Sequence, residues 1–114
     1  METCLFCQIA SRERPGKIVY EDEQSVAFED IHPKAPIHIL IVPRRHLATL
    51  LDASEADNAL LGHLLSVANR IARQIGIADR GFRLVINCNS EGGQAVYHLH
   101  LHLLGGRPLG WHPA

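Results

Sequence analysis

The sequence predicts an α+β fold with a mainly antiparallel five-stranded sheet, one short helix and one long helix. Strand-like segments occur both before and after a single long amphipathic segment, at residues 18–21, 25–29, 36–43, 82–87 and 98–104. Strands gathered on either side of one helix are typical of α+β folds, whereas strict alternation of strands and helices predicts a parallel sheet. A chain of 114 residues suits a single domain with its own core, which we assign to residues 1–114.

The composition is that of an ordinary globular protein and argues against several classes of function. Hydrophobic residues make up 46% of the chain and charged residues 20%, with a net charge of −1 when the histidines are neutral. This balance gives no electrostatic basis for binding nucleic acid or an anionic membrane, and no apolar run approaches the ~20 residues of a membrane span. The first residues lack the pattern of a secretory signal, and an odd count of three cysteines suits a reducing compartment, so we expect a cytoplasmic protein.

The N-terminal segment carries the motif Cys4-x-x-Cys7 on a short predicted helix that runs to about Ser11. Such a pair can be half of a zinc site, a redox pair or two small buried residues. A redox pair usually follows a strand, and nothing upstream is long enough to be one. A zinc site needs two further ligands, for which His46 and His98 are the candidates.

Residues 18–21 and 25–29 predict a hairpin because a polar turn, residues 22–24, separates two short β-prone runs. Asp30 then leaves the second strand just before an X-Pro step, which is typical of a turn. Its carboxylate has two interpretations: it forms the turn, which the sequence favours, or it binds a ribose diol.

The middle of the chain predicts a central strand followed by the long helix. Residues 36–43 form a β-branched run bounded by prolines, in which His38 is by default a hydrogen-bonded core histidine. Ser54 is a suitable N-cap for the helix and Gly76 a suitable stop. The apolar residues of the helix recur at helical spacing over a wide face, which could serve a subunit contact as well as the sheet: Leu60, Leu61, Leu64, Leu65, Ala68, Ile71, Ala72 and Ile75.

Residues 98–104 alternate histidine with leucine and then end at a Gly-Gly pair. Alternation of period 2 predicts a half-buried strand with three imidazoles on one face and the leucines on the other. The preceding loop, residues 87–97, holds another Gly-Gly pair that lets the backbone approach a ligand. Its side chains can donate to phosphate or ribose oxygens, at Asn87, Asn89, Ser90 and Gln94. Together these features indicate a site rather than a strand with a merely polar face.

The run from Gly92 through His98, His100 and His102 to Gly105-Gly106-Arg107 resembles the signature of the histidine triad (HIT) superfamily, and in particular its Hint branch of nucleoside phosphoramidases. The resemblance covers nearly the whole chain and includes Asp30-Ile31, Ala35-Pro36-Ile37-His38, the Leu-rich helix and the tail that carries Trp111. It implies the HIT fold, with sheets joined across a homodimer. It also implies that the tail, residues 105–114, contributes to the dimer and to the partner's active site.

The resemblance further implies a reaction: hydrolysis of the P–N bond of purine nucleoside 5′-phosphoramidates, which releases AMP or GMP through a nucleotidyl-histidine intermediate. The catalytic positions are His100 as nucleophile, His102 at the phosphate and His38 in the surrounding histidine network. The nucleotide-binding positions are Asp30, Ile31, Asn87, Gly93, Gln94, Ala95, Val96, His100 and His102. No catalytic metal is required, because a neutral imidazole is itself a nucleophile at pH 7.

Many bacterial relatives hold zinc with two cysteines and two histidines, so the resemblance implies a closed, structural zinc site at Cys4, Cys7, His46 and His98. The chain departs from some relatives at Ala95, where those carry a hydroxyl often thought to protonate the leaving amine. Ala95 has no side-chain proton to give.

Three other functions compete with this one. A zinc hydrolase could bind a catalytic metal with the three alternating histidines, although these positions span too far for one ion's ~2.1 Å bonds. A dinucleoside polyphosphate hydrolase of another HIT branch is the nearest alternative. A nucleotide-binding regulatory module without important turnover is the third.

Overall fold

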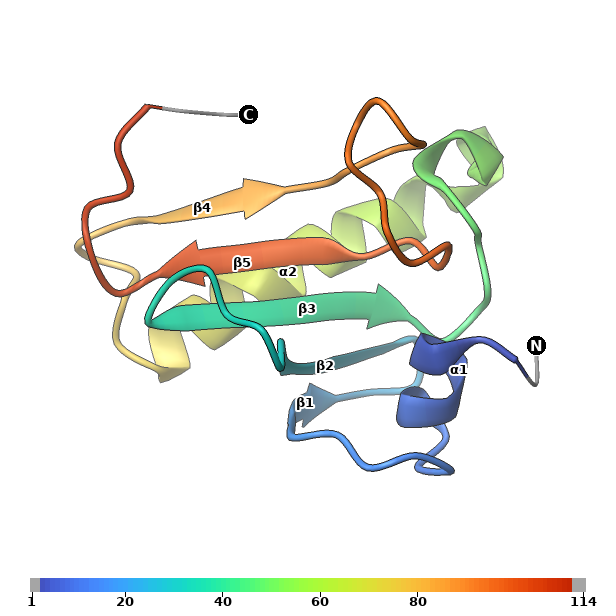
Figure 1. Cartoon of the computed structure of the whole chain (residues 1–114), viewed down its shortest axis with the longest axis horizontal. Coiled ribbons are helices and arrows are strands. Elements are labelled where there is room, and N and C mark those ends of the chain that lie inside the picture. Colours follow the sequence, from blue (N-terminus) through green and yellow to red (C-terminus); the bar gives the residue numbers. More distant parts are fainter. Residues whose placement is uncertain (1–2, 112–114) are drawn as a thin grey trace.

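A computed structural model of the chain describes residues 3–111, which form one five-stranded sheet flanked by helices (Figure 1). The strand order is β1-β2-β3-β5-β4, and every neighbouring pair is antiparallel. The strands are β1 (Ile18–Glu21), β2 (Ser25–Glu29), β3 (Ile37–Pro43), β4 (Phe82–Val85) and β5 (Leu101–Gly105). The α+β fold with a five-stranded antiparallel sheet, predicted from the sequence, is therefore confirmed.

The predicted short and long helices are both present, as α1 (Leu5–Ala10) and α2 (Asn58–Gln74). Ser54 caps a separate 3₁₀ turn, Glu55–Asp57, because its side chain accepts from the backbone N–H of Ala56; α2 begins directly after this turn. Gly76 follows the last turn of α2 with a φ of +82°, the left-handed conformation that ends helices. Within residues 3–111, no helix is both long enough and apolar enough to cross a lipid bilayer.

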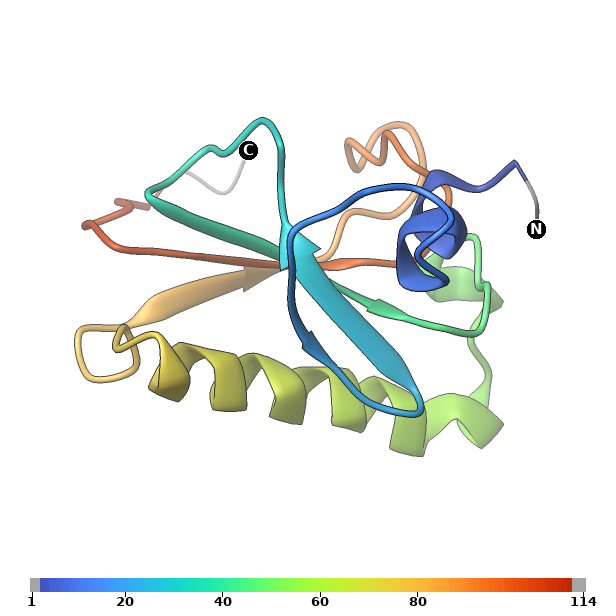
Figure 2. The same ribbon diagram turned by 90° about the horizontal axis from the view of Figure 1, so that it is seen from below.

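The sheet separates two layers, with α2 on one face and α1 on the other (Figure 2). The larger core fills the space between the sheet and α2 and is built mainly from Leu, Ile, Val and Ala side chains. A smaller cluster joins α1 to the opposite face of β2 and β3, through Phe6, Ile9, Ala10, Val26, Phe28, Leu40 and Val42. The loops before β3 and before β5 lie on the same side of the sheet as α1, so the predicted site residues of these loops, such as Asp30 and Asn87, belong to that side.

The histidine-leucine segment divides its side chains as predicted, but its strand is shorter. Leu99, Leu101 and Leu103 all enter the core against α2. The strand begins at Leu101 rather than at His98, because its pairing with β3 stops at Ile41–Leu101, although β3 itself continues to Pro43. Beyond that point the backbone N–H of Leu99 donates to the carbonyl of Leu47 at 2.6 Å. His98 and His100 therefore lie on irregular backbone.

Candidate active site

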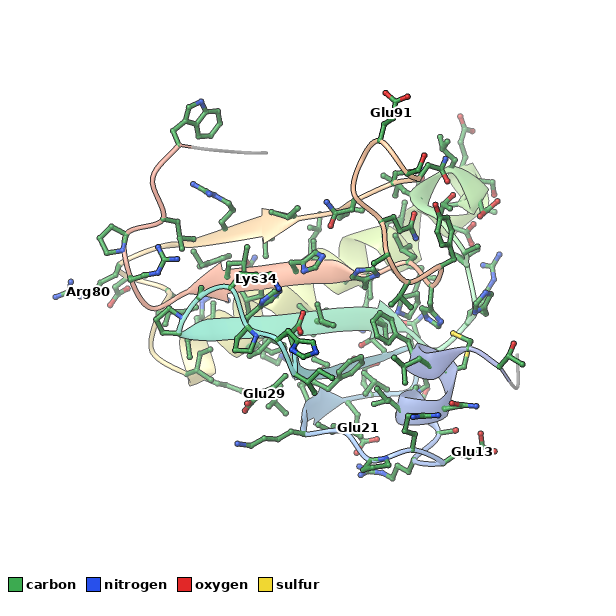
Figure 3. All side chains as sticks on the ribbon, in the orientation of Figure 1. Glu13, Glu21, Glu29, Lys34, Arg80 and Glu91 are labelled. Carbon is green, nitrogen blue, oxygen red and sulfur yellow. The ribbon has the colours of Figure 1, made fainter. Side chains whose placement is uncertain are left out.

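A cavity of about 750 Å³ opens on the α1 side of the sheet. One wall is apolar and comes from α1, β2 and β3, with Leu5, Phe6, Ile9, Phe28 and Leu40. The polar wall brings together the three predicted catalytic histidines and all but one of the predicted nucleotide-binding residues: Asp30, Ile31, His38, Asn87, Gly93, Ala95, Val96, His100 and His102. Lys34, in the loop that crosses in front of the sheet in Figure 3, also lines the cavity.

His100 is held as a neutral imidazole with a fixed tautomer. Its Nδ1 lies 2.7 Å from the carbonyl oxygen of His98, so Nδ1 carries the proton and Nε2 keeps its lone pair. The residue is only 7% exposed, and burial lowers its pKa. Phe6 of α1 contacts the ring edge-on, with centroids 5.1 Å apart and an angle of 87° between the rings. His100 therefore has the protonation state of a nucleophile at neutral pH.

His102 carries the opposite tautomer, and a backbone amide sets it. The N–H of Lys34 donates to Nδ1 of His38 at 3.0 Å, so the proton of His38 is on Nε2. His38 Nε2 lies 2.9 Å from Nδ1 of His102 and donates to it, which leaves the proton of His102 on its own Nε2. That buried N–H has no hydrogen-bond partner among the described residues. Burial, together with the neighbouring His100 and His38, lowers the pKa of His102 to about 4.

Asp30 forms the turn that the sequence favours and also lines the cavity. One carboxylate oxygen accepts from the backbone N–H of His32 at 2.8 Å and so forms the turn. The other lies 3.5 Å from Nε2 of His38 and faces the cavity. The ligand atoms of Asp30, His38 and His102 are close enough to one another for a metal ion. A metal would have to displace the proton of His38 Nε2 while Lys34 still occupies Nδ1, so this cluster is better explained as a hydrogen-bond chain.

The loop between β4 and β5 forms the rim of the cavity opposite the β2–β3 loop. Asn87 lines the cavity and its amide donates to the carbonyl of Gly92 at 2.8 Å, which folds the loop back on itself. A Cβ at Gly92 would lie 2.4 Å from the carbonyl oxygen of Cys88, so the tight loop requires glycine there. Gln94 does not line the cavity, and its buried amide bonds to Ala48, Val96 and Asn89 instead. Glu91, labelled in Figure 3, stands at the exposed tip.

Cys4, Cys7, His46 and His98 form a second group beside the cavity, with ligand atoms within 4.8 Å of one another. The sulfur-to-nitrogen distances are 3.3 Å for Cys4 to His98 Nδ1, and 3.4 Å for Cys7 to Nδ1 of both His98 and His46. Zn–S bonds of about 2.3 Å and Zn–N bonds of about 2.0–2.1 Å place neighbouring ligand atoms about 3.6 Å apart in a tetrahedron. The arrangement therefore fits a four-coordinate zinc ion.

The environment of these four residues also suits a metal. His98 Nε2 donates to the carbonyl of Pro43 at 2.8 Å, which leaves Nδ1 free as a ligand. Histidines that bind zinc typically donate their other ring N–H to a carbonyl or carboxylate in this way. Burial and the adjacent Cys4 raise the pKa of the Cys7 thiol to about 11, so a bound cation would have to displace its proton.

Comparison with known proteins agrees with this geometry. The HIT domain profile matches residues 11–109. The chain is 51% identical over 109 residues to the purine nucleoside phosphoramidase of Escherichia coli K12, covering 96% of this chain and 92% of that protein. The chain belongs to the HIT family. The crystal structure of a HIT family hydrolase from Legionella pneumophila superposes with a TM-score of 0.96 at 50% identity, covering 98% of this chain and all of the other. The protein is therefore a HIT hydrolase.

Another HIT structure bears on the second group of residues. A zinc-bound histidine triad family protein from Mycobacterium smegmatis has a TM-score of 0.79 and 32% identity, covering 93% of this chain and 76% of the other. The chain is thus similar to a HIT protein that binds zinc, and it has a set of residues that can do so.

The three alternating histidines do not converge on one point: Nδ1 of His98 faces thiols, that of His100 a carbonyl and that of His102 another imidazole.

Two features of the HIT cavity could not be predicted from the sequence. The Lys34 amide that sets the tautomers of His38 and His102 leaves no trace in the sequence, because every residue except proline has such an N–H. The second is the apolar wall. Phe6 and Ile9 lie on the buried face of α1, but nothing in the sequence shows which strands that helix covers.

Proposed function

We propose that this protein hydrolyses the P–N bond of purine nucleoside 5′-phosphoramidates, releasing AMP or GMP and an amine. The observation that carries the proposal is the pair of opposite tautomers on adjacent imidazoles: a lone pair on His100 Nε2 and a proton on His102 Nε2. Phosphoryl transfer to a nitrogen needs such a pair, with a nucleophile for phosphorus and a donor for the phosphoryl oxygens. The 51% identity to the E. coli purine nucleoside phosphoramidase supports the same activity.

In the proposed reaction His100 Nε2 attacks phosphorus and the P–N bond to the amine breaks, with the leaving nitrogen taking a proton from solvent water. The nucleotide is then held on His100. Water attacks this nucleotidyl-imidazole and returns one proton to solvent, which releases the nucleotide and restores the lone pair of His100. His102 Nε2–H and the backbone N–H groups of Ala95 and Val96, which line the cavity, would hold the phosphoryl oxygens. Asp30 and Ile31 would bind the ribose and base against the apolar wall. Ala95 cannot supply the proton that the leaving amine needs, and His102, being neutral, donates a hydrogen bond only.

We also propose that Cys4, Cys7, His46 and His98 hold a structural zinc ion. A closed four-ligand site supplies folding energy rather than an open position for substrate. Here it would fix the first turn of α1 to His98, two residues before the nucleophile. The three cysteines are free, which supports a reducing compartment, and so we infer a cytoplasmic location.

A homodimer with a shared active site is part of the same proposal. Trp111 is 82% exposed at the end of a tail that runs past the β4 edge of the sheet (Figure 1). The tail is tied to its own chain, through Arg83 to the carbonyl of Gly110 and Arg107 to that of Lys34, so Trp111 is presented outward. Large apolar side chains are also exposed on α2 and after β4, at Leu65 and Ile86. Exposed apolar side chains and a free sheet edge support a second copy as occupant, with the tail contributing to its cavity, namely residues 105–114, of which 112–114 lie outside the described residues.

A rapid-quench experiment with adenosine 5′-phosphoramidate labelled at phosphorus tests the proposal. Wild-type protein should carry acid-labile, base-stable label on a histidine and release AMP, with or without a chelator, whereas His100→Ala should do neither. Loss of turnover on chelation, from protein shown still to be folded, would favour a catalytic metal. Turnover of diadenosine polyphosphates but not of the phosphoramidate would indicate another HIT branch, and binding of AMP without any turnover a regulatory module.

A further inference from the structure

Gln94 is a buried polar residue in the loop between β4 and β5, and the proposed reaction gives its side chain no contact with substrate. It is 7% exposed, and all of its amide's hydrogen-bonding groups are directed into the protein. Nε2 donates to the carbonyls of Ala48 at 2.8 Å and Val96 at 3.1 Å, and Oε1 accepts from the backbone N–H of Asn89 at 2.9 Å. Burying an amide is favourable only when its hydrogen bonds are made, and here they all go to backbone.

The backbone on both sides of Gln94 faces the cavity. Gly93, Ala95 and Val96 line it. The N–H groups of Ala95 and Val96 are those that the proposed function directs at the phosphate, because that of Gly93 donates within the loop. The loop has little regular structure, and its other hydrogen bonds are internal turns, such as Gly93 N–H to the Ser90 carbonyl at 3.1 Å. The bond from Gln94 to Ala48 is different because it joins the loop to a segment that leaves β3.

That segment, residues 46–48, also holds the start of the histidine run. The carbonyl of Leu47 accepts from the N–H of Leu99, and that of Ala48 accepts from Gln94. The two carbonyls thus hold, side by side, the backbone that leads into His100 and the loop that faces it. The separation between the loop N–H groups and the imidazoles is set from this one segment.

We propose that Gln94 is a positioning residue that fixes the phosphate-binding loop at the correct distance from His100 and His102. The proposal rests on the proposed function, since it assumes that a nucleotide phosphate lies between loop and imidazoles. Without the bond to Ala48 the loop would keep its internal turns but lose its fixed place, so phosphate binding would weaken. In the proposed function the base and ribose bind at other walls of the cavity, so their binding would stay the same.

Two variants separate this role from a general effect on folding. Gln94→Glu keeps the shape of the side chain and an acceptor for Asn89 but loses both donors to Ala48 and Val96. Gln94→Met keeps much of the volume and removes all three bonds without adding a charge. Gln74→Glu, the same chemical change on the exposed last turn of α2, is the matched control.

The measurement is the affinity of AMP and of adenosine for each folded protein, by calorimetry and NMR titration, with hydrogen exchange of residues 87–97. We expect both Gln94 variants to bind AMP about tenfold or more weakly, to bind adenosine within about twofold of wild type, and to exchange loop amides faster. Gln74→Glu should match wild type. If both variants keep the wild-type ratio of AMP to adenosine affinity, the proposal is overturned. If wild-type protein itself binds AMP no better than adenosine, the proposed function fails instead.

Discussion

The two faces of the sheet are made by the same strands but have different chemistry. Towards α2, strands β3 and β5 present only aliphatic side chains, and this core excludes water. Towards α1, the alternate residues of the same strands present His38 and His102, and each of them faces a leucine of the neighbouring strand, Leu104 and Leu40 respectively. Because successive strand residues point to opposite faces, one register fixes both the core and the site. Substitutions on the two faces should therefore separate stability from activity.

The largest expected effect is that of His100→Ala. Removing the nucleophile should lower kcat by about 10⁴-fold, equivalent to about 5.5 kcal/mol of activation free energy. The fold should persist, because the neighbouring leucines fill the opposite face. Steady-state kinetics and thermal melting of the same preparation measure both quantities. A variant with more than about a tenth of wild-type kcat would exclude His100 as the nucleophile.

Leu103→Ala should do the reverse. Leu103 has no exposed surface and lies in the core against α2, so truncation should lower the free energy of unfolding by about 2–5 kcal/mol. The folded fraction should retain wild-type kcat. Leu104→Ala is the matched control, since the next leucine lines the cavity instead and should alter KM more than stability. Urea unfolding and kinetics on both variants test the separation; equal loss of stability in both would contradict it.

Metal removal tests whether α1 is held by the group of two cysteines and two histidines. At a free zinc concentration 100-fold above its dissociation constant, binding stabilises the folded state by about 2.7 kcal/mol. A chelator should therefore lower the melting temperature and release one zinc ion per chain, as measured by elemental analysis. Cys7→Ser should melt at a lower temperature than wild type and respond little to the chelator. An equal response in both proteins would place the metal elsewhere.

Acid should weaken the α1 face before it weakens the α2 face. Burial lowers the pKa of His102 to about 4 and also lowers that of His100, whereas histidines in the unfolded chain have a pKa near 6.5. On acidification the unfolded chain therefore takes up protons before the folded protein does. The free energy of unfolding should then fall as pH drops below 6.5, by about 2 kcal/mol from His102 alone between pH 6.5 and 5.

Urea unfolding at pH 7 and pH 5 measures this loss, and His102→Gln should reduce it. Asp22 does not interfere, because the carboxyl of the unfolded chain titrates near 3.8, below this pH range, and hydrogen bonds hold the pKa lower still in the folded protein. The acid limb of kcat/KM should likewise lie below pH 6.5. Stability that rises towards pH 5 would show that the imidazoles are charged in the folded protein.

The smallest effect is expected at the hydrogen bond between His63 of α2 and Asp22 of the β1–β2 turn, 2.7 Å long and partly exposed. Partly exposed pairs contribute little, and Asp22 also accepts from Tyr20, Gln24 and Ser25. His63→Ala should change the free energy of unfolding by less than about 1 kcal/mol and leave kcat unchanged. A larger loss of unfolding free energy, measured with urea, would show that this hydrogen bond stabilises the protein more than its exposure implies.

The features that could be predicted from the sequence are those that repeat along the chain. The spacing of apolar residues gave α2, and the alternation of residues 98–104 gave the opposite faces of its histidines and leucines. Where that strand begins could not be predicted, because it depends on where β3 stops pairing. The direction in which the Gln94 side chain points could not be predicted either, since its main partner, the carbonyl of Ala48, is 46 residues away in the sequence. Motifs indicated which residues gather, but long-range backbone contacts decide which atom each residue presents.

The proposed reaction depends on His100 and His102 being neutral imidazoles of opposite tautomer. Nitrogen-15 NMR of histidine-labelled protein at pH 7, with wild type compared to His100→Ala and His102→Gln for assignment, reads each ring nitrogen directly. We expect a protonated Nδ1 and a bare Nε2 on His100, and a bare Nδ1 with a protonated Nε2 on His102. The same tautomer on both rings, or a doubly protonated ring on either, would contradict it.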